Sequence, residues 1–205
     1  IGKVWSMLLA PVFGFGHSVN LLSAFSTALG CGILASLIAS WTEDGFAGTA
    51  AGLTAGLMST VWLNATETEV YAVAMVFGCI ILWAADRAGR NSDARWALLA
   101  AYLAGLASTL HLIALLVVPS AILLIFTTAD GYFAVPVGRR YVDGRRESHS
   151  FAKLLRSGII VALVGTTCIL YLLIRARQDP AINQGNPSTV GALFDVLMRR
   201  QYDVA

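Results

Sequence analysis

Long apolar stretches separated by short polar segments constrain this chain more than any other feature of its sequence. Six of them follow one another, at residues 19–41, 46–63, 70–85, 97–109, 112–127 and 158–174. A helix needs about 17–25 mostly apolar residues to cross the roughly 30 Å hydrocarbon core of a bilayer. Charged residues make up 13% of the chain, whereas a soluble domain carries about 25%. The pattern therefore predicts a polytopic membrane protein with about six helices.

The predicted fold class is all-α: a transmembrane helix bundle over residues 1–174, followed by a polar tail over 175–205. The stretches 97–109 and 112–127 are short for a span, and only a turn at His111 separates them. They are therefore also consistent with a hairpin or a re-entrant pair. In the tail, Ser188 is a candidate N-cap for a short helix through Arg200, whose apolar stripe predicts that it lies on the membrane surface.

Small residues recur every fourth position in the first two stretches and predict that these helices pack together. One stripe comprises Ala24, Ala28, Gly32, Ser36 and Ser40, and the other comprises Gly48, Gly52 and Gly56. Small side chains at this spacing let two helix backbones approach closely in lipid. We expect the glycine stripe to face the Ala28, Gly32 and Ser36 stripe.

The distribution of Lys and Arg predicts how the bundle is oriented. Six spans alternate between two sides; the segments 40–45, 86–95 and 128–156 on one side carry nine Lys and Arg, and the other side carries five. Cytoplasmic loops are enriched in these residues. We therefore expect the polar loops 86–95 and 128–156 to be cytoplasmic, and Glu67, Glu69, His111 and Arg175 to lie on the non-cytoplasmic side.

Several function classes are disfavoured. The net charge of +2 is too small to indicate a nucleic-acid-binding protein. The sequence has no phosphate-binding loop, zinc-protease motif or serine-hydrolase motif. No charged residue lies in the middle of a predicted span, which argues against an ion pump or a proton relay. The three cysteines lie inside apolar stretches without the spacing of metal ligands, so we expect neither a disulfide nor a metal site.

The candidate site is a polar cluster at one membrane surface. Glu67 and Glu69 are carboxylates set between two apolar stretches, which is a costly place for an acid and therefore a candidate functional position. Tyr71 follows Glu67 by one helical turn. Carboxylates, one imidazole and arginines with a fork that matches phosphate suit an amphiphilic substrate with a phosphate head group.

Each member also has a purely structural interpretation. Thr66 and Glu69 fit a capping box at the start of the next helix. His111 in a tight turn is typical of a helix cap, and Arg175 and Arg177 at a helix end would satisfy the negative end of the helix dipole. The sequence alone leaves these alternatives open.

Several blocks resemble the membrane family, first described as a domain of unknown function, that includes the transmembrane protein O-mannosyltransferases acting on plexin-type receptor domains. Their order and spacing hold over nearly the whole chain, and the Glu-x-Glu-Val-Tyr block and the tail are the more specific parts. The blocks are residues 19–24, 67–72, 105–111 with Pro119, 174–183, 185–189 and 200–202.

The resemblance implies a fold like that of the GT-C glycosyltransferases, which take a sugar from a polyprenyl-phosphate carrier on the non-cytoplasmic side. It implies catalytic roles at Glu67, Glu69 and His111. The implied substrate-binding residues are Tyr71, Arg175, Arg177 and Asn183. The expected function is transfer of a sugar, mannose by the resemblance, from the lipid carrier to a protein or lipid acceptor, in a bacterial inner membrane. No cofactor is expected besides that donor, and the expected partners are membrane lipid, the polyprenyl-phosphate sugar and other membrane subunits.

Two hypotheses remain open at this point. Relatives carry an acidic motif, with the expected catalytic Asp, in an external loop before the part that corresponds to Ile1. The chain starts without Met or a signal-peptide pattern, so we expect that loop either to precede Ile1 in a longer protein or to be lost. The first case describes an enzyme, and the second describes a non-catalytic accessory subunit of a membrane complex.

Overall fold

The computed structural model of the chain describes residues 2–68, 70–134, 141–142, 145–146, 151–180, 183, 185–198 and 200. It divides into two units, Ile1–Gly165 and Thr166–Ala205. Helices dominate both units, so the predicted all-α bundle is confirmed. The strands β1 (Tyr141–Val142) and β2 (Arg145–Arg146) form a small antiparallel pair.

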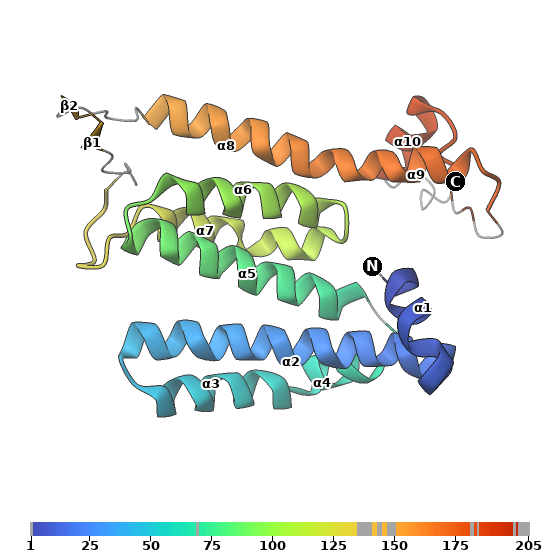
Figure 1. Ribbon diagram of the computed structural model, residues 1–205, viewed down its shortest axis with the longest axis horizontal. Coiled ribbons are helices and arrows are strands. Elements are labelled where there is room, and N and C mark those ends of the chain that lie inside the picture. Colours follow the sequence, from blue (N-terminus) through green and yellow to red (C-terminus); the bar gives the residue numbers. More distant parts are fainter. Residues whose placement is uncertain are drawn as a thin grey trace. The chain divides into compact units, whose positions relative to one another are not determined.

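The first unit is built from helices joined by short turns (Figure 1). Asp44 and Asp93 start two of them, because each carboxylate accepts a hydrogen bond from the backbone N–H two residues later. Figure 1 shows the α2–α3 and α5–α6 turns at one end of the bundle, and the starts of α5 and η1 at the opposite end. The helices are α1 (Gly2–Phe13), α2 (Phe15–Thr42), α3 (Gly45–Leu57), α4 (Ser59–Thr66), α5 (Val70–Arg90), α6 (Ala94–Ser108), η1 (Leu112–Val117), α7 (Val118–Ile125) and α8 (Phe151–Thr166).

Fewer helices than predicted are long enough to cross a bilayer. Within the described residues, length and composition qualify α2, α5 and the stretch Phe151–Ala176. The helices α3 and α4 qualify only together, and they are bent by 66° at their junction. That makes three spans, or four with the bent pair, in place of about six. The predicted fourth and fifth spans are the short helices α6 and Leu112–Ile125, as the hairpin alternative expected.

The glycine stripe of α3 packs on α2, but on a neighbouring face of α2 to the one predicted. A Cβ added at Gly48 would lie 2.5 Å from the carbonyl oxygen of Ala35 and 2.6 Å from the Cβ of Ala39. A Cβ added at Gly52 would lie 2.9 Å from the Cβ of Ala35. By contrast, a Cβ added at Gly32 would meet nothing within 4 Å. The sequence misled because α2 carries small residues on adjacent faces, and the spacing alone does not choose between them.

Small residues also form the core where α5, α6, η1 and α7 meet. Alanines predominate there, and Ile81 is the one large side chain that is almost fully buried. A Cβ at Gly89 would collide with the carbonyl oxygens of Leu124 and Thr127, so α5 and the end of α7 are in backbone contact. Close backbone approach of this kind is how helices pack in lipid, where burial of apolar side chains gives little driving force.

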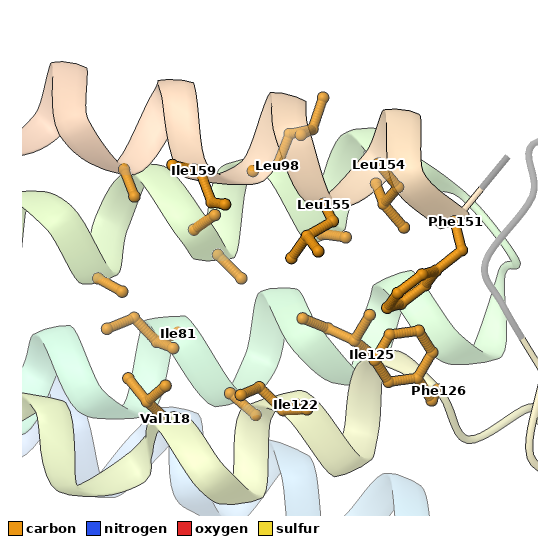
Figure 2. A pocket seen from close by; sticks show the side chains of 17 residues that line it. Ile81, Leu98, Val118, Ile122, Ile125, Phe126, Phe151, Leu154, Leu155 and Ile159 are labelled. Atoms are coloured by element: carbon orange, nitrogen blue, oxygen red, sulfur yellow. The ribbon is translucent and has the colours of Figure 1, made fainter. Parts of the chain in front are cut away.

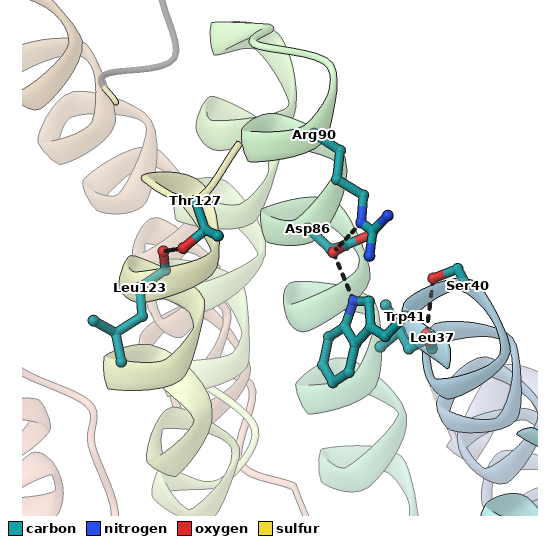
Figure 3. A network of polar contacts seen from close by, with 7 residues as sticks. All are labelled: Leu37, Ser40, Trp41, Asp86, Arg90, Leu123 and Thr127. Carbon is teal, nitrogen blue, oxygen red and sulfur yellow. Dashed lines mark hydrogen bonds and ion pairs between the residues drawn. The ribbon is translucent and has the colours of Figure 1, made fainter. Parts of the chain in front are cut away.

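The segment 86–95 is not the polar loop that the sequence predicted, because α5 continues to Arg90 and the next helix begins at Ala94. Asp86 is buried, with 7% of its surface exposed. Its Oδ1 accepts hydrogen bonds from Trp41 Nε1 at 2.8 Å and from Arg90 Nε at 2.9 Å (Figure 3). The i, i+4 pair with Arg90 lets the helix continue through polar residues.

The second unit contains η2 (Thr167–Ile169), α9 (Leu170–Ala176) and α10 (Val190–Leu197). The cap of α10 is Thr189, whose hydroxyl accepts from the backbone N–H of Ala192 at 3.1 Å, rather than the predicted Ser188. The helix ends at Leu197, before the predicted Arg200. The predicted cap is one residue too early, because Ser188 and Thr189 are both good caps and the sequence does not separate them.

Candidate functional site

The candidate site lies at the end of the first unit where α4 stops and α5 begins. Thr66 is the last residue of α4, and its hydroxyl donates to the carbonyl oxygen of Leu63 at 3.0 Å. The predicted capping box is therefore wrong for Thr66, which ends one helix instead of starting the next. Asn64 belongs to the same helix, and its side chain donates to the carbonyl oxygen of Thr60 at 2.7 Å.

Glu67 follows directly, in extended backbone at the C-cap of α4. Its side chain is exposed. Among the described residues, its carboxylate has no hydrogen-bond or ion-pair partner. Glu67 therefore has no structural role that would explain a carboxylate here, and its charge is available to a ligand.

Thr68 ties this junction to α2. Its hydroxyl donates a hydrogen bond to the side-chain oxygen of Asn20, 48 residues earlier in the chain. Asn20 belongs to one of the blocks that carry the family resemblance, yet it was not chosen as a site residue. The signal was an amide near the start of the apolar stretch 19–41, and such a residue finds a partner when it faces other helices. The bond fixes the segment that presents Glu67.

Tyr71 and His111 meet at the same end of the bundle. Tyr71 lies in the first turn of α5, and His111 stands between α6 and η1. Their ring centroids are 4.9 Å apart with an interplanar angle of 70°, which is an edge-to-face contact. Tyr71 and His111 are 40 positions apart in the sequence, which predicted both at the same membrane surface, and the structure brings their rings into contact.

His111 also caps a helix, as its structural alternative predicted. Its Nδ1 accepts a hydrogen bond from the backbone N–H of Ile113 at 3.2 Å, at the start of η1. An accepting Nδ1 means that a neutral ring carries its proton on Nε2. The cap and the contact with Tyr71 together hold the imidazole in place, and its Nε2–H has no hydrogen-bond partner among the described residues.

The remaining candidates belong to the second unit, apart from Glu69, which lies outside the described residues. Arg175 donates from Nη1 to Oε1 of Gln178 at 3.2 Å. Arg177 donates from Nε to the carbonyl oxygen of Ser188 at 3.0 Å, and Asn183 donates to Oδ1 of Asn186 at 2.9 Å. Arg177 and Asn183 therefore order the segment that leads into α10, and each keeps other polar atoms for a ligand.

An apolar pocket of about 410 Å³ lies between α5, α6, α7 and α8 (Figure 2). The Phe126 and Phe151 rings meet at one end of it, with centroids 6.0 Å apart and an interplanar angle of 45°. Figure 2 shows Leu155 and Ile159 of α8 pointing into it opposite Ile122 of α7. No acid, base or nucleophile lines this pocket. It can therefore take a hydrocarbon chain, but it offers no groups for chemistry.

No metal centre is evident in the part of the chain that the structure describes, because no three His, Cys, Asp or Glu side chains there could share an ion. The site therefore offers an exposed carboxylate, at Glu67, at the same end of the bundle as an imidazole and a phenol that contact each other. A carboxylate can accept a proton from a hydroxyl group, and the imidazole and phenol can donate hydrogen bonds to a substrate.

Comparison with known proteins adds one finding. The family model described as the Protein O-mannosyl-transferase TMEM260 N-terminal domain matches residues 1–131. The matched part contains Glu67, Tyr71 and His111, and it stops before the second unit. No curated protein and no solved structure matches the chain.

Proposed function

Because the chain belongs to the protein O-mannosyltransferase family defined by that N-terminal domain, we propose that it forms the membrane core of a glycosyltransferase that moves mannose from a polyprenyl-phosphate carrier to a protein acceptor. The observation that carries the proposal is the contact between Tyr71 and His111, at the end of the membrane-type bundle where α4 stops at Glu67. The family is described by this activity, and the groups at this end of the bundle support the proposal.

The reaction has two chemical requirements. The bond between the sugar C1 and the phosphate oxygen breaks, and a new bond forms between C1 and a hydroxyl oxygen of the acceptor. The hydroxyl proton must go to a base, and the polyprenyl phosphate leaves with one more negative charge. In the proposal, the Glu67 carboxylate faces the acceptor, and Glu69 lines the same face. The Nε2–H of His111 and the Tyr71 hydroxyl hold sugar hydroxyls by hydrogen bonds.

The leaving phosphate calls for a cation. A guanidinium binds phosphate through two parallel N–H bonds, and Arg175 has its Nη1 on Gln178 and further N–H groups to offer. We assign the carrier phosphate to Arg175, with Arg177 and Asn183 shaping the segment beside it. The apolar pocket of Figure 2 suits the isoprenoid chain of the donor, because both are hydrocarbon throughout.

The proposal places the site on the non-cytoplasmic side of a bacterial inner membrane. The support is the excess of Lys and Arg in the segments 86–95 and 128–156. The α5–α6 turn, within the first of these segments, lies at the opposite end of the bundle from the starts of α5 and η1 (Figure 1). The donor and any further membrane subunits would then meet the enzyme within or above the outer leaflet.

Replacing Arg175 by lysine tests the assignment of the carrier phosphate. Lysine keeps the charge but loses the two-pronged fork. In the full-length protein, we expect KM for the polyprenyl-phosphate sugar to rise about tenfold, the equivalent of one lost charge-assisted hydrogen bond. Melting of the purified variant should match wild type. Unchanged KM with unchanged melting would remove Arg175 from the site.

A further inference from the structure

Two adjoining cavities lie between α2 and α5, one along the middle of the two helices and the other toward their C-terminal ends. One has a volume of about 440 Å³ and the other about 230 Å³. Ser36 and Trp83 line both, so the two cavities meet there. Neither cavity includes a residue of the candidate glycosyltransferase site.

The larger cavity is apolar. On the α2 side it is lined by Ala28 and Gly32, from the small-residue stripe that α3 does not cover, and on the α5 side by Ile80. A Cβ at Gly32 would have open space for 4 Å around it. Both helices are long and apolar enough to cross a membrane, so this cavity lies at a depth where lipid chains surround the protein.

The smaller cavity is polar and carries two arginines. The guanidinium of Arg87 lies 4.9 Å from the ring centroid of Trp83 and 5.9 Å from that of Trp96. In the part of the chain described, Arg87 has no carboxylate partner, whereas Arg90 is paired with Asp86. The carboxylate of Asp86 therefore offsets one of the two positive charges, and the cavity keeps a net charge of about +1.

An apolar cavity that opens into a positively charged one matches the shape of an anionic lipid. We propose that the groove between α2 and α5 binds an anionic phospholipid, with its phosphate at Arg87 and Asn91 and one acyl chain beside Gly32. Basic pockets between transmembrane helices on the cytoplasmic side are where such head groups bind. The excess of Lys and Arg in the segments 86–95 and 128–156 predicts that this end of the bundle is cytoplasmic.

The arrangement also explains why Arg87 lies over two tryptophans. The two indole rings hold the guanidinium by a cation–π interaction, which does not use its N–H groups as hydrogen-bond donors. The N–H groups then remain available to phosphate oxygens. An exposed arginine without a ligand would lose side-chain entropy in this position for little gain.

The test measures lipid binding to the full-length protein. Delipidated protein in detergent is titrated with phosphatidylglycerol or phosphatidylcholine, and native mass spectrometry measures the lipid that stays bound. Wild type should bind phosphatidylglycerol about tenfold more tightly than phosphatidylcholine. Both lipids carry the phosphate, but the choline of phosphatidylcholine adds a positive charge beside the arginines of the cavity. Arg87→Gln should abolish that preference. Arg95→Gln, which removes an exposed arginine outside the groove, should leave it intact.

A second variant tests the apolar half and does not depend on the Arg87 stacking. Gly32→Leu should fill the space beside Gly32 and lower binding of both lipids, while melting stays that of wild type. Gly16→Leu, at a helical glycine that also has open space around it, is the control. Glycerol phosphate, the head group without chains, should fail to compete. Equal binding of both lipids by wild type, full competition by glycerol phosphate, or unchanged binding in Arg87→Gln and Gly32→Leu would each overturn the proposal.

Discussion

Replacing Glu67 by glutamine should lower mannose transfer by the full-length protein at least about 100-fold, the usual contribution of a positioned acid or base. Glutamine keeps the size of the side chain and removes its charge. The Glu67 side chain is exposed and has no partner among the described residues, so the fold does not depend on its carboxylate. The melting temperature of the variant should therefore equal that of wild type.

A matched control for this result is Glu43→Gln. Glu43 is also an exposed glutamate just after a helix, at the C-cap of α2, but it lies at the opposite end of the bundle. Its replacement should leave transfer unchanged. Full transfer by Glu67→Gln would remove the carboxylate from the mechanism. Loss of transfer together with a lowered melting temperature would show that Glu67 acts on the fold and would contradict its assignment.

Replacing Gly48 by alanine should destabilise the first unit by about 1–3 kcal/mol, the usual cost of overpacking. The new methyl group would lie 2.5 Å from the carbonyl oxygen of Ala35 and 2.9 Å from the backbone nitrogen of Ala39. Backbone atoms of a helix cannot move aside as the end of a side chain can. The helices α2 and α3 must therefore separate, and the contact at Gly52 would be lost with them.

The same substitution at Gly32 provides the comparison. It lies on α2 with nothing within 4 Å of the added Cβ. Alanine there should be neutral or stabilising, by up to about 1 kcal/mol, because glycine is the poorer helix former. Unfolding in mixed micelles measures both variants. Equal stability of Gly48→Ala and Gly32→Ala would mean that α3 does not pack on α2 through its glycines.

The sequence predicted where helices lie better than how they pair. The stretch 19–41 corresponds to α2 and the stretch 70–85 to α5, because a long apolar run has few alternatives to a helix. The end of α5 was predicted five residues too early, since Asp86 looked like the start of a loop. The spacing of Asp86 and Arg90, and Asp93 as a cap, were the signals for the longer helix.

Packing was harder to predict for a physical reason. In lipid, small residues mark a possible contact without saying which helix fills it. The stripe at Ala28, Gly32 and Ser36 is real, but α3 rests on the neighbouring face at Ala35 and Ala39, and the stripe itself lines the cavity toward α5. Only the fold in three dimensions distinguishes the two faces.

For the candidate site, the sequence named Tyr71 and His111, and the structure places their rings in contact. The sequence did not predict the hydrogen bond between Thr68 and Asn20, because a contact between residues 48 positions apart leaves no periodic pattern in the sequence. The roles of Glu69, Arg175, Arg177 and Asn183 stay predictions. Testing these roles requires a transfer assay that contains the phosphate-bearing sugar donor.

The most direct measurement of the central claim is mannose transfer by the full-length wild-type protein. Purified protein in liposomes is given polyprenyl-phosphate mannose carrying a radioactive sugar, and a protein acceptor exposed on the outer face. We predict label on the acceptor, in an amount that depends on the lipid carrier and falls to background in Glu67→Gln. No label with a range of polyprenyl carriers and acceptors would contradict the account and would identify the chain as an accessory subunit.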